Sequence, residues 1–338
     1  MERLVYIDIL KGIAIILVVM GHMFAPYTDY LQSPINQMVY SVHMPLFIFL
    51  SGLVFHLSQS KKAIRTTIIK RALSLLLPFF CFSAVYCFAK NISYTDMLLK
   101  NETHNGYWFT LVLFEIIFIS IISEYVLTFI KREGGVKLKI DIILNITIAL
   151  TLLFIAKTEI IQEPFKTLFS TDKVAKFYMF FQIGKFVRTY SIIGSIFRKQ
   201  WLYIVCVISY FVLFSRCGYD LQYTNIVSFI LPCCGILILT NLVERNQDFF
   251  NHYGVLAKIG KNSLEIYLIH FLILSTIPKE IIDCFGNVYL QIFVLFLLST
   301  VCIAISLLIA KIIHCSDILD FFLLGKGHYL KKILSKIG

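Results

Sequence analysis

Two basic side chains, Lys11 and His22, stand in the first long apolar run of the sequence, Tyr6–Pro26. On an α-helix this offset is about three turns, so both fall on nearly the same face, roughly 16 Å apart along the axis. Asp8 lies one turn before Lys11 and close to the same stripe. Ionisable groups in a membrane-length helix normally face a protein interior or a wet cavity, where they mark function. Because the pKa of histidine lies near neutrality, His22 has the chemistry of a general base.

Two further apolar runs also carry polar or ionisable side chains. The second run begins near His43 and contains a small notch at Ser51, which packing against another helix explains as well as ligand binding does. The fourth run begins with the interfacial aromatic Trp108 and carries Glu115 about two turns deeper. An intramembrane carboxylate usually has a partner, so we expect Glu115 to orient His22 or His43, with a purely structural ion pair as the alternative.

Two other sites complete the set of candidates. In the ninth run, Tyr267 and His270 are one turn apart on one face. His270 either takes part in the reaction or is a hydrogen-bonded packing residue. Lys70 and Arg71 form a basic pair before the third run, and such a pair either holds phosphates or only sets topology. No Cys/His spacing typical of a metal site is present, so no metal is predicted.

Composition decides what kind of protein holds these residues. Of 338 residues, 58% are hydrophobic and only 15% are charged, whereas a soluble domain of this length carries about 25% charged residues. The chain is therefore predicted to be an all-α, polytopic integral membrane protein. The formal charge of +11 does not indicate nucleic-acid binding, because the basic residues sit in short connectors between apolar runs.

The apolar runs predict about ten transmembrane helices. They lie near residues 5–26, 38–58, 72–90, 107–129, 139–157, 175–194, 200–217, 223–243, 262–278 and 288–313. About three quarters of the Lys and Arg residues fall on the side of the N-terminus, which places both termini in the cytosol and the protein in the inner (cytoplasmic) membrane. Residues 1–338 are read as a single domain, with an amphipathic tail at 315–338 on the membrane surface. Cys217 and Cys284 fall in outer loops, where they either pair or stay free.

Several motifs taken together resemble the membrane-bound acyltransferase-3 family, most closely its sugar O-acetyltransferase branch, which includes the fucose O-acetylase-like proteins. The resemblance runs from about residue 3 to residue 313. It rests on the Lys11-x10-His22 spacing and on the stretches PLFIFLSG, KRALSLLLPF, YWFTLVLF, FYMFFQIGKF and NSLEIYLIH.

The resemblance implies roles for individual positions. The family's first-helix basic residue matches Lys11, its essential histidine matches His22, and its Ser-Gly motif includes Ser51. Its pair of arginines before the third helix is matched by Arg71 alone, because Ser74 stands at the second position. Lys70 is the expected substitute for that second arginine.

The resulting hypothesis is acyl transfer from cytosolic acyl-CoA, expected to be acetyl-CoA, to a hydroxyl of a surface polysaccharide or lipid-linked sugar. His22 acts as general base and Glu115 orients it. Lys11, Lys70 and Arg71 contact the CoA, while Ser51 or Tyr267 donates to the oxyanion. The remaining candidates on the acceptor side are His43, Trp108 and His270.

Three alternatives stay open at this point. A covalent acyl-His intermediate is a variant of the mechanism. A lipid-linked sugar flippase or proton-coupled transporter would also place ionisable groups inside helices, although no internal repeat supports it. A non-catalytic sensor or scaffold is the third class.

Overall fold

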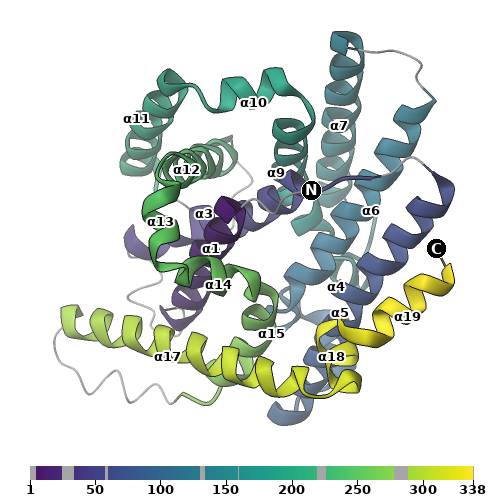
Figure 1. The fold of residues 1–338 in the computed structure, drawn as a ribbon, viewed down its shortest axis with the longest axis vertical. Coiled ribbons are helices and arrows are strands. Elements are labelled where there is room, and N and C mark those ends of the chain that lie inside the picture. The colour runs from purple at the N-terminus through teal and green to yellow at the C-terminus, as the bar shows by residue number, and fades with distance from the viewer. Residues whose placement is uncertain are drawn as a thin grey trace. The chain divides into compact units, whose positions relative to one another are not determined.

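The computed structural model describes residues 5–24, 34–57, 60–129, 134–158, 160–218, 226–277 and 288–337. Within these ranges every regular element is a helix and none is a strand (Figure 1). Seven of the helices are long and apolar enough to cross a membrane, judged by length and composition. The prediction of an all-α, polytopic membrane protein is thereby confirmed.

Each of the ten expected spans coincides with a described helix. The seven that are both long and apolar enough to cross a membrane are α1 (Val5–Phe24), α4 (Lys61–Lys90), α6 (Trp108–Thr128), α7 (Gly134–Lys157), α11 (Gln200–Cys217), α12 (Ile226–Arg245) and α17 (Val288–His314). The other three are α3 (Pro34–Leu53), α9 (Thr171–Thr189) and α15 (Ser263–Leu274). The number of crossings and the cytosolic termini stay predictions.

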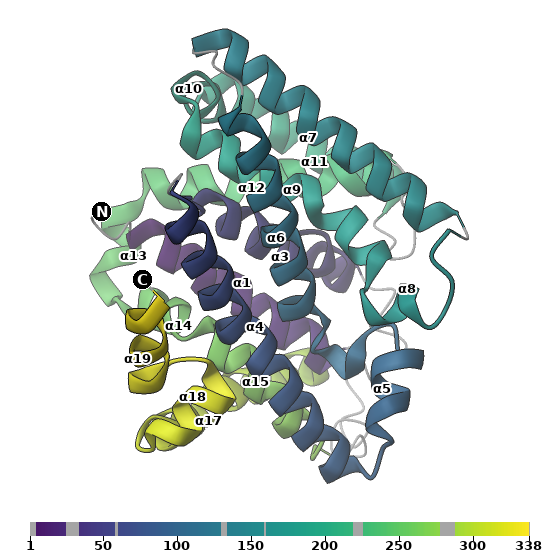
Figure 2. The same ribbon diagram turned by 90° about the vertical axis from the view of Figure 1, so that its right-hand side faces the viewer.

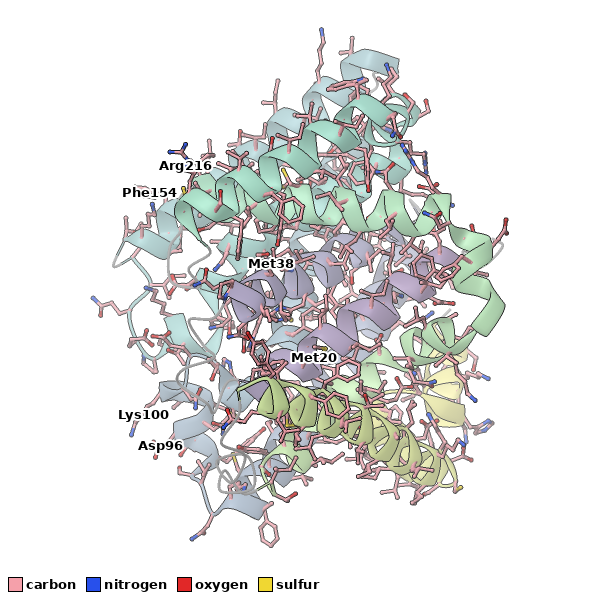
Figure 3. All side chains as sticks on the ribbon, turned by 90° about the vertical axis from the view of Figure 1, so that its left-hand side faces the viewer. Met20, Met38, Asp96, Lys100, Phe154 and Arg216 are labelled. Carbon is pink, nitrogen blue, oxygen red and sulfur yellow. The ribbon has the colours of Figure 1, made fainter. Side chains whose placement is uncertain are left out.

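Short helices fill the connections between these segments. They are α5 (Tyr94–Lys100), the 3-10 turn η1 (His104–Gly106), α8 (Phe165–Leu168), α10 (Ser191–Phe197), α13 (Gln247–Tyr253), α14 (Val255–Lys261), α18 (Asp317–Leu324) and α19 (Gly327–Ile337). Figure 3 shows α5 with the exposed ion pair between Asp96 and Lys100, whose Nζ–Oδ1 distance is 2.6 Å.

Contacts divide the chain into two compact units, which are described separately. Unit 1 comprises Met1–Leu53 with Phe186–Ala310, and unit 2 comprises Val54–Lys185 with Lys311–Gly338. In unit 1, α1 is the central helix and contacts α3, α12, α14 and α15. Its apolar side chains surround the helix, as in a helix buried in a larger core. Six of them have no exposed surface: Ile9, Leu10, Ala14, Ile15, Val18 and Val19.

Two glycines allow α1 and α14 to touch backbone to backbone. A Cβ atom on Gly260 would overlap the Asp8 carbonyl and the Gly12 nitrogen, and a Cβ on Gly12 would overlap the Leu256 carbonyl. Small residues permit this close approach between membrane helices. The two glycines therefore fix the position of α14 along α1, and α14 and α15 lie beside α1 in Figures 1 and 2.

In unit 2, α4 contacts α5, α6, α18 and α19 (Figure 2). The tail forms α18 and α19, which pack on α4. Gly325 ends α18 with a φ of +60°, a left-handed conformation that glycine adopts without steric cost. A Cβ at this position would also overlap the Leu73 carbonyl of α4. The second half of the tail, α19, is an amphipathic helix, and its place on the membrane surface stays a prediction.

Candidate active site

His22 lies near the C-terminal end of α1 and is half-buried. Its imidazole is surrounded by aromatic rings of α3 and α15. The centroid distances are 4.7 Å to Phe271, 5.5 Å to His270 and 6.4 Å to Tyr40. The Tyr40 hydroxyl donates to the carbonyl of Gly21 at 3.3 Å, which ties α3 to the end of α1. Figure 3 shows the side chains of α1 and α3, with Met20 and Met38 labelled.

His43 of α3 is buried close to this cluster. Its ring meets the Tyr40 ring edge to face at 4.9 Å. Its Nδ1 lies 2.7 Å from the Val39 carbonyl one turn earlier. Because a carbonyl only accepts, Nδ1 carries the proton, and the Nε2 of the neutral ring is left with a lone pair. The structure therefore brings His43 and His22 together through Tyr40.

His270 of α15 is the most deeply buried of the three histidines, with no exposed surface. Its Nδ1 lies 3.0 Å from the Ile266 carbonyl, so Nδ1 again carries the proton. Its Nε2 is also buried and has no hydrogen-bond partner in the described part of the chain. Tyr267 is buried one turn earlier, with its ring 5.9 Å from that of His270. His22, His43, Tyr267 and His270 thus form one cluster in unit 1.

The other predicted residues of unit 1 lie at different depths. Asp8 is buried and Lys11 is half-buried, and His22 at the other end of the α1 stripe is half-buried too, so neither end of the stripe is exposed. The Ser51 hydroxyl donates to the Phe47 carbonyl at 2.9 Å. Its hydrogen is therefore engaged, and Ser51 must rotate before it can donate to an oxyanion.

Lys70 and Arg71 lie on α4 of unit 2, where Lys70 is exposed and Arg71 is half-buried. Neither residue forms an ion pair within the described ranges. A half-buried guanidinium without a carboxylate is suited to an anionic ligand, because its desolvation is otherwise uncompensated.

Glu115 lies on α6 of unit 2 and lines a cavity of about 590 Å³. Apart from Glu115 and Thr171, apolar side chains such as Phe79, Phe118 and Val174 line this cavity. The Glu115 Oε2 atom is buried and has no partner among the described residues. The expected pairing of Glu115 with a histidine stays a prediction.

Trp108 is the first residue of α6 and lies beside a cluster of polar and aromatic residues in unit 2. Its ring stacks on Phe177 at 5.4 Å, and the Lys173 ammonium is 5.7 Å from its centroid. In the same region His104 is fully buried, with Nδ1 3.4 Å from the Ser170 hydroxyl. Burial, reinforced by the charge of Lys173, lowers the pKa of His104 to about 4.

A buried polar network around Lys185 in unit 2 was not anticipated from the sequence. The Lys185 ammonium lies 2.7 Å from Glu124 and 3.1 Å from Asp141. Asn145 donates to Asp141 at 2.7 Å and accepts from the Tyr178 hydroxyl at 2.6 Å. The signal for this network was the carboxylates near the ends of apolar runs. Within the described residues no group of His, Cys, Asp and Glu is arranged to hold a metal.

These features define a multi-pass helical membrane protein with a cluster of histidines in one unit. Residues 4–311 match the family model described as an acyltransferase domain, Acyl_transf_3. The chain therefore belongs to this acyltransferase family, which confirms the resemblance seen in the motifs.

One curated relative extends the comparison. Nodulation protein NolL of Mesorhizobium japonicum is 32% identical over 238 residues, which cover 65% of this chain and 58% of the relative. The match thus spans less than two thirds of that protein's length. No solved structure matches the chain.

Proposed function

We propose that this protein transfers an acyl group, expected to be acetyl, from acyl-CoA to a hydroxyl of a surface polysaccharide or lipid-linked sugar. The observation that carries the proposal is the position of His22. It is a half-buried imidazole on a membrane-length helix, 5.5 Å from the ring of His270 and linked to His43 through Tyr40, in a chain of the acyltransferase family.

The chemistry assigned to His22 is proton transfer. Its imidazole takes the proton of the acceptor hydroxyl while that oxygen attacks the thioester carbonyl. The tetrahedral intermediate then breaks its C–S bond, and the imidazolium returns the proton to the departing sulfur of CoA. The products are the sugar ester and the CoA thiol. A positioned base of this kind contributes about 10²–10⁴-fold in rate.

The binding roles follow the residue chemistry. Lys11, Lys70 and Arg71 are assigned to the phosphates of the donor, since each offers a positive charge from a side chain that is not fully buried. His43 packs on Tyr40 beside His22, and Tyr267 lies next to His270. Both are therefore assigned to contacts with the acceptor. Trp108 keeps its place on the acceptor side, Ser51 keeps its role at the oxyanion, and Glu115 stays one candidate for orienting His22.

The test compares His22→Ala and His22→Asn with His56→Ala, a control at an exposed histidine. Cells carrying each variant at equal membrane abundance are assayed for ester-linked acetyl in their surface polysaccharide. Purified protein is assayed for binding of labelled acetyl-CoA. We expect loss of the ester in both His22 variants, retained acetyl-CoA binding, and normal ester in the control.

Two results would overturn the proposal. Normal ester content with His22→Ala would remove His22 from the chemistry. If the wild-type protein binds no acetyl-CoA, the transport or scaffold classes account better for the same helices.

A further inference from the structure

His270 is a buried imidazole whose hydrogen-bonding state is fixed by its own helix. Its Nδ1–H donates to the Ile266 carbonyl at 3.0 Å, which leaves the Nε2 of the neutral ring as an acceptor. This nitrogen has no partner in the described part of the chain. Buried polar atoms are nearly always hydrogen-bonded, so an unpartnered one points to a group that joins it during function.

His22 is the histidine that His270 faces. Their ring centroids are 5.5 Å apart, with the planes tilted by 38°. No hydrogen bond joins Nε2 of His270 to His22 in the structure, but the separation leaves room for one bridging water, or for a direct bond after a small rotation of the rings. Phe271 packs on both rings, at 4.7 Å from His22 and 4.0 Å from His270, and closes the apolar side of the pair.

The backbone holds the two histidines in register. Gly260 touches the α1 backbone at Asp8 and Gly12, and His270 meets His22 further along both segments. The sequence separation from glycine to histidine is ten residues in both segments, from Gly12 to His22 and from Gly260 to His270. On α1 this step is about 15 Å. The α14–α15 segment is therefore tied to α1 at two places, at Gly260 in α14 and at His270 in α15, and the glycine contact helps to place α15 beside His22.

We propose that His270 is the positioning residue for His22. Its Nε2 accepts a hydrogen bond from a ring N–H of His22, directly or through one water, and this leaves the other His22 nitrogen unprotonated for the acceptor hydroxyl. When His22 takes the proton of that hydroxyl, the same hydrogen bond stabilises the imidazolium. The inference rests on the proposed function, and it gives His270 the orienting task that the sequence analysis assigned to Glu115.

The experiment measures initial rates with labelled acetyl-CoA on purified protein carrying His270→Gly, His270→Gln, His22→Ala or both His270→Gly and His22→Ala. We expect His270→Gly to lower kcat about 10–10²-fold, the usual effect of removing a group that orients a functional histidine. The KM for acetyl-CoA should change by less than about twofold, since His270 contacts no donor group in this scheme. Added imidazole should restore part of kcat in His270→Gly and none in His22→Ala.

The double variant and a packing control make the outcome decisive. Leu268→Ala removes a fully buried side chain from the same helix without removing a histidine. We expect it to respond to imidazole no more than the wild type. The double variant should be no slower than His22→Ala, because His270 acts only through His22.

Each remaining result has a defined reading. If His270→Gly does not fold, His270→Gln at wild-type kcat overturns the proposal, and a slow, folded His270→Gln supports it. A normal kcat in a folded His270→Gly also overturns it, and so does equal rescue of Leu268→Ala by imidazole. If instead His22→Ala is fully active, the proposed function fails first, and the two failures are thereby distinguished.

Discussion

The glycine contact between α1 and α14 predicts a substitution that impairs catalysis without touching a catalytic residue. In Gly260→Ala the new Cβ meets the carbonyl of Asp8 and the nitrogen of Gly12. Both are backbone atoms of α1, so no side chain can rotate away. The two segments must separate by about 1 Å or more, and a misplacement of that size at a reacting centre costs about 10²-fold in rate.

The assay combines initial rates with thermal unfolding of the purified protein. We expect Gly260→Ala to lower kcat per folded molecule about 10–10²-fold. We also expect it to lower the free energy of unfolding by about 1–3 kcal/mol, the usual effect of overpacking. The matched control is Gly135→Ala in the first turn of α7, where a Cβ meets no atom within 4 Å. This control should be neutral or slightly stabilising, because alanine is the better helix former.

Two outcomes would refute the reasoning about register. Wild-type kcat and Tm in Gly260→Ala would show that α14 does not constrain α1. A lowered Tm with unchanged kcat per folded molecule would show that the glycine contact serves stability alone and does not set the His22–His270 geometry.

Two further predictions concern unit 2. Lys185→Met should lower the free energy of unfolding by about 3–5 kcal/mol, because it removes the cation that faces the buried carboxylate of Asp141. Asp141→Asn in the same chain should recover part of that loss. If Lys185→Met lowers the Tm no more than a surface substitution does, the prediction is wrong. Burial and the charge of Lys173 lower the pKa of His104 to about 4, so the unfolded chain binds this proton more readily and stability should fall as the pH drops from about 6.5 towards 4. The Tm of His104→Asn, measured across that range, should fall less steeply than that of the wild type, and equal slopes would exclude His104 as the source.

The sequence was sufficient to locate the helices, and the roles of the site residues stay predictions. Apolar runs of membrane length are a local property, so the segments around His22, Glu115 and His270 were located correctly. Periodicity also shows which residues share a face of one helix, as Tyr267 and His270 do. It does not show which helix lies opposite, because that depends on packing between segments far apart in the chain.

The residues whose partners were missed illustrate this limit. The partners of Lys185 could not be foreseen, because Glu124 and Asp141 lie on two other helices. The sequence did not indicate that Gly12 and Gly260 allow α1 and α14 to touch backbone to backbone. Ser51 was assigned as a donor from its residue type, whereas its hydrogen is engaged by the carbonyl of Phe47. In each case the missing information was a three-dimensional contact.

A neutral histidine has one advantage over a carboxylate as the partner of His22 in a half-buried membrane site. A carboxylate would carry a negative charge throughout the cycle, and the desolvation of that charge would oppose folding in the resting state. With His270 as partner, the resting pair is neutral. Charge appears only when His22 becomes an imidazolium opposite the oxyanion on the thioester carbon, and His270 offers it the Nε2 lone pair that the bond between Nδ1 and Ile266 leaves available. The interaction is therefore stronger in the transition state than in the ground state, which is the condition for raising kcat.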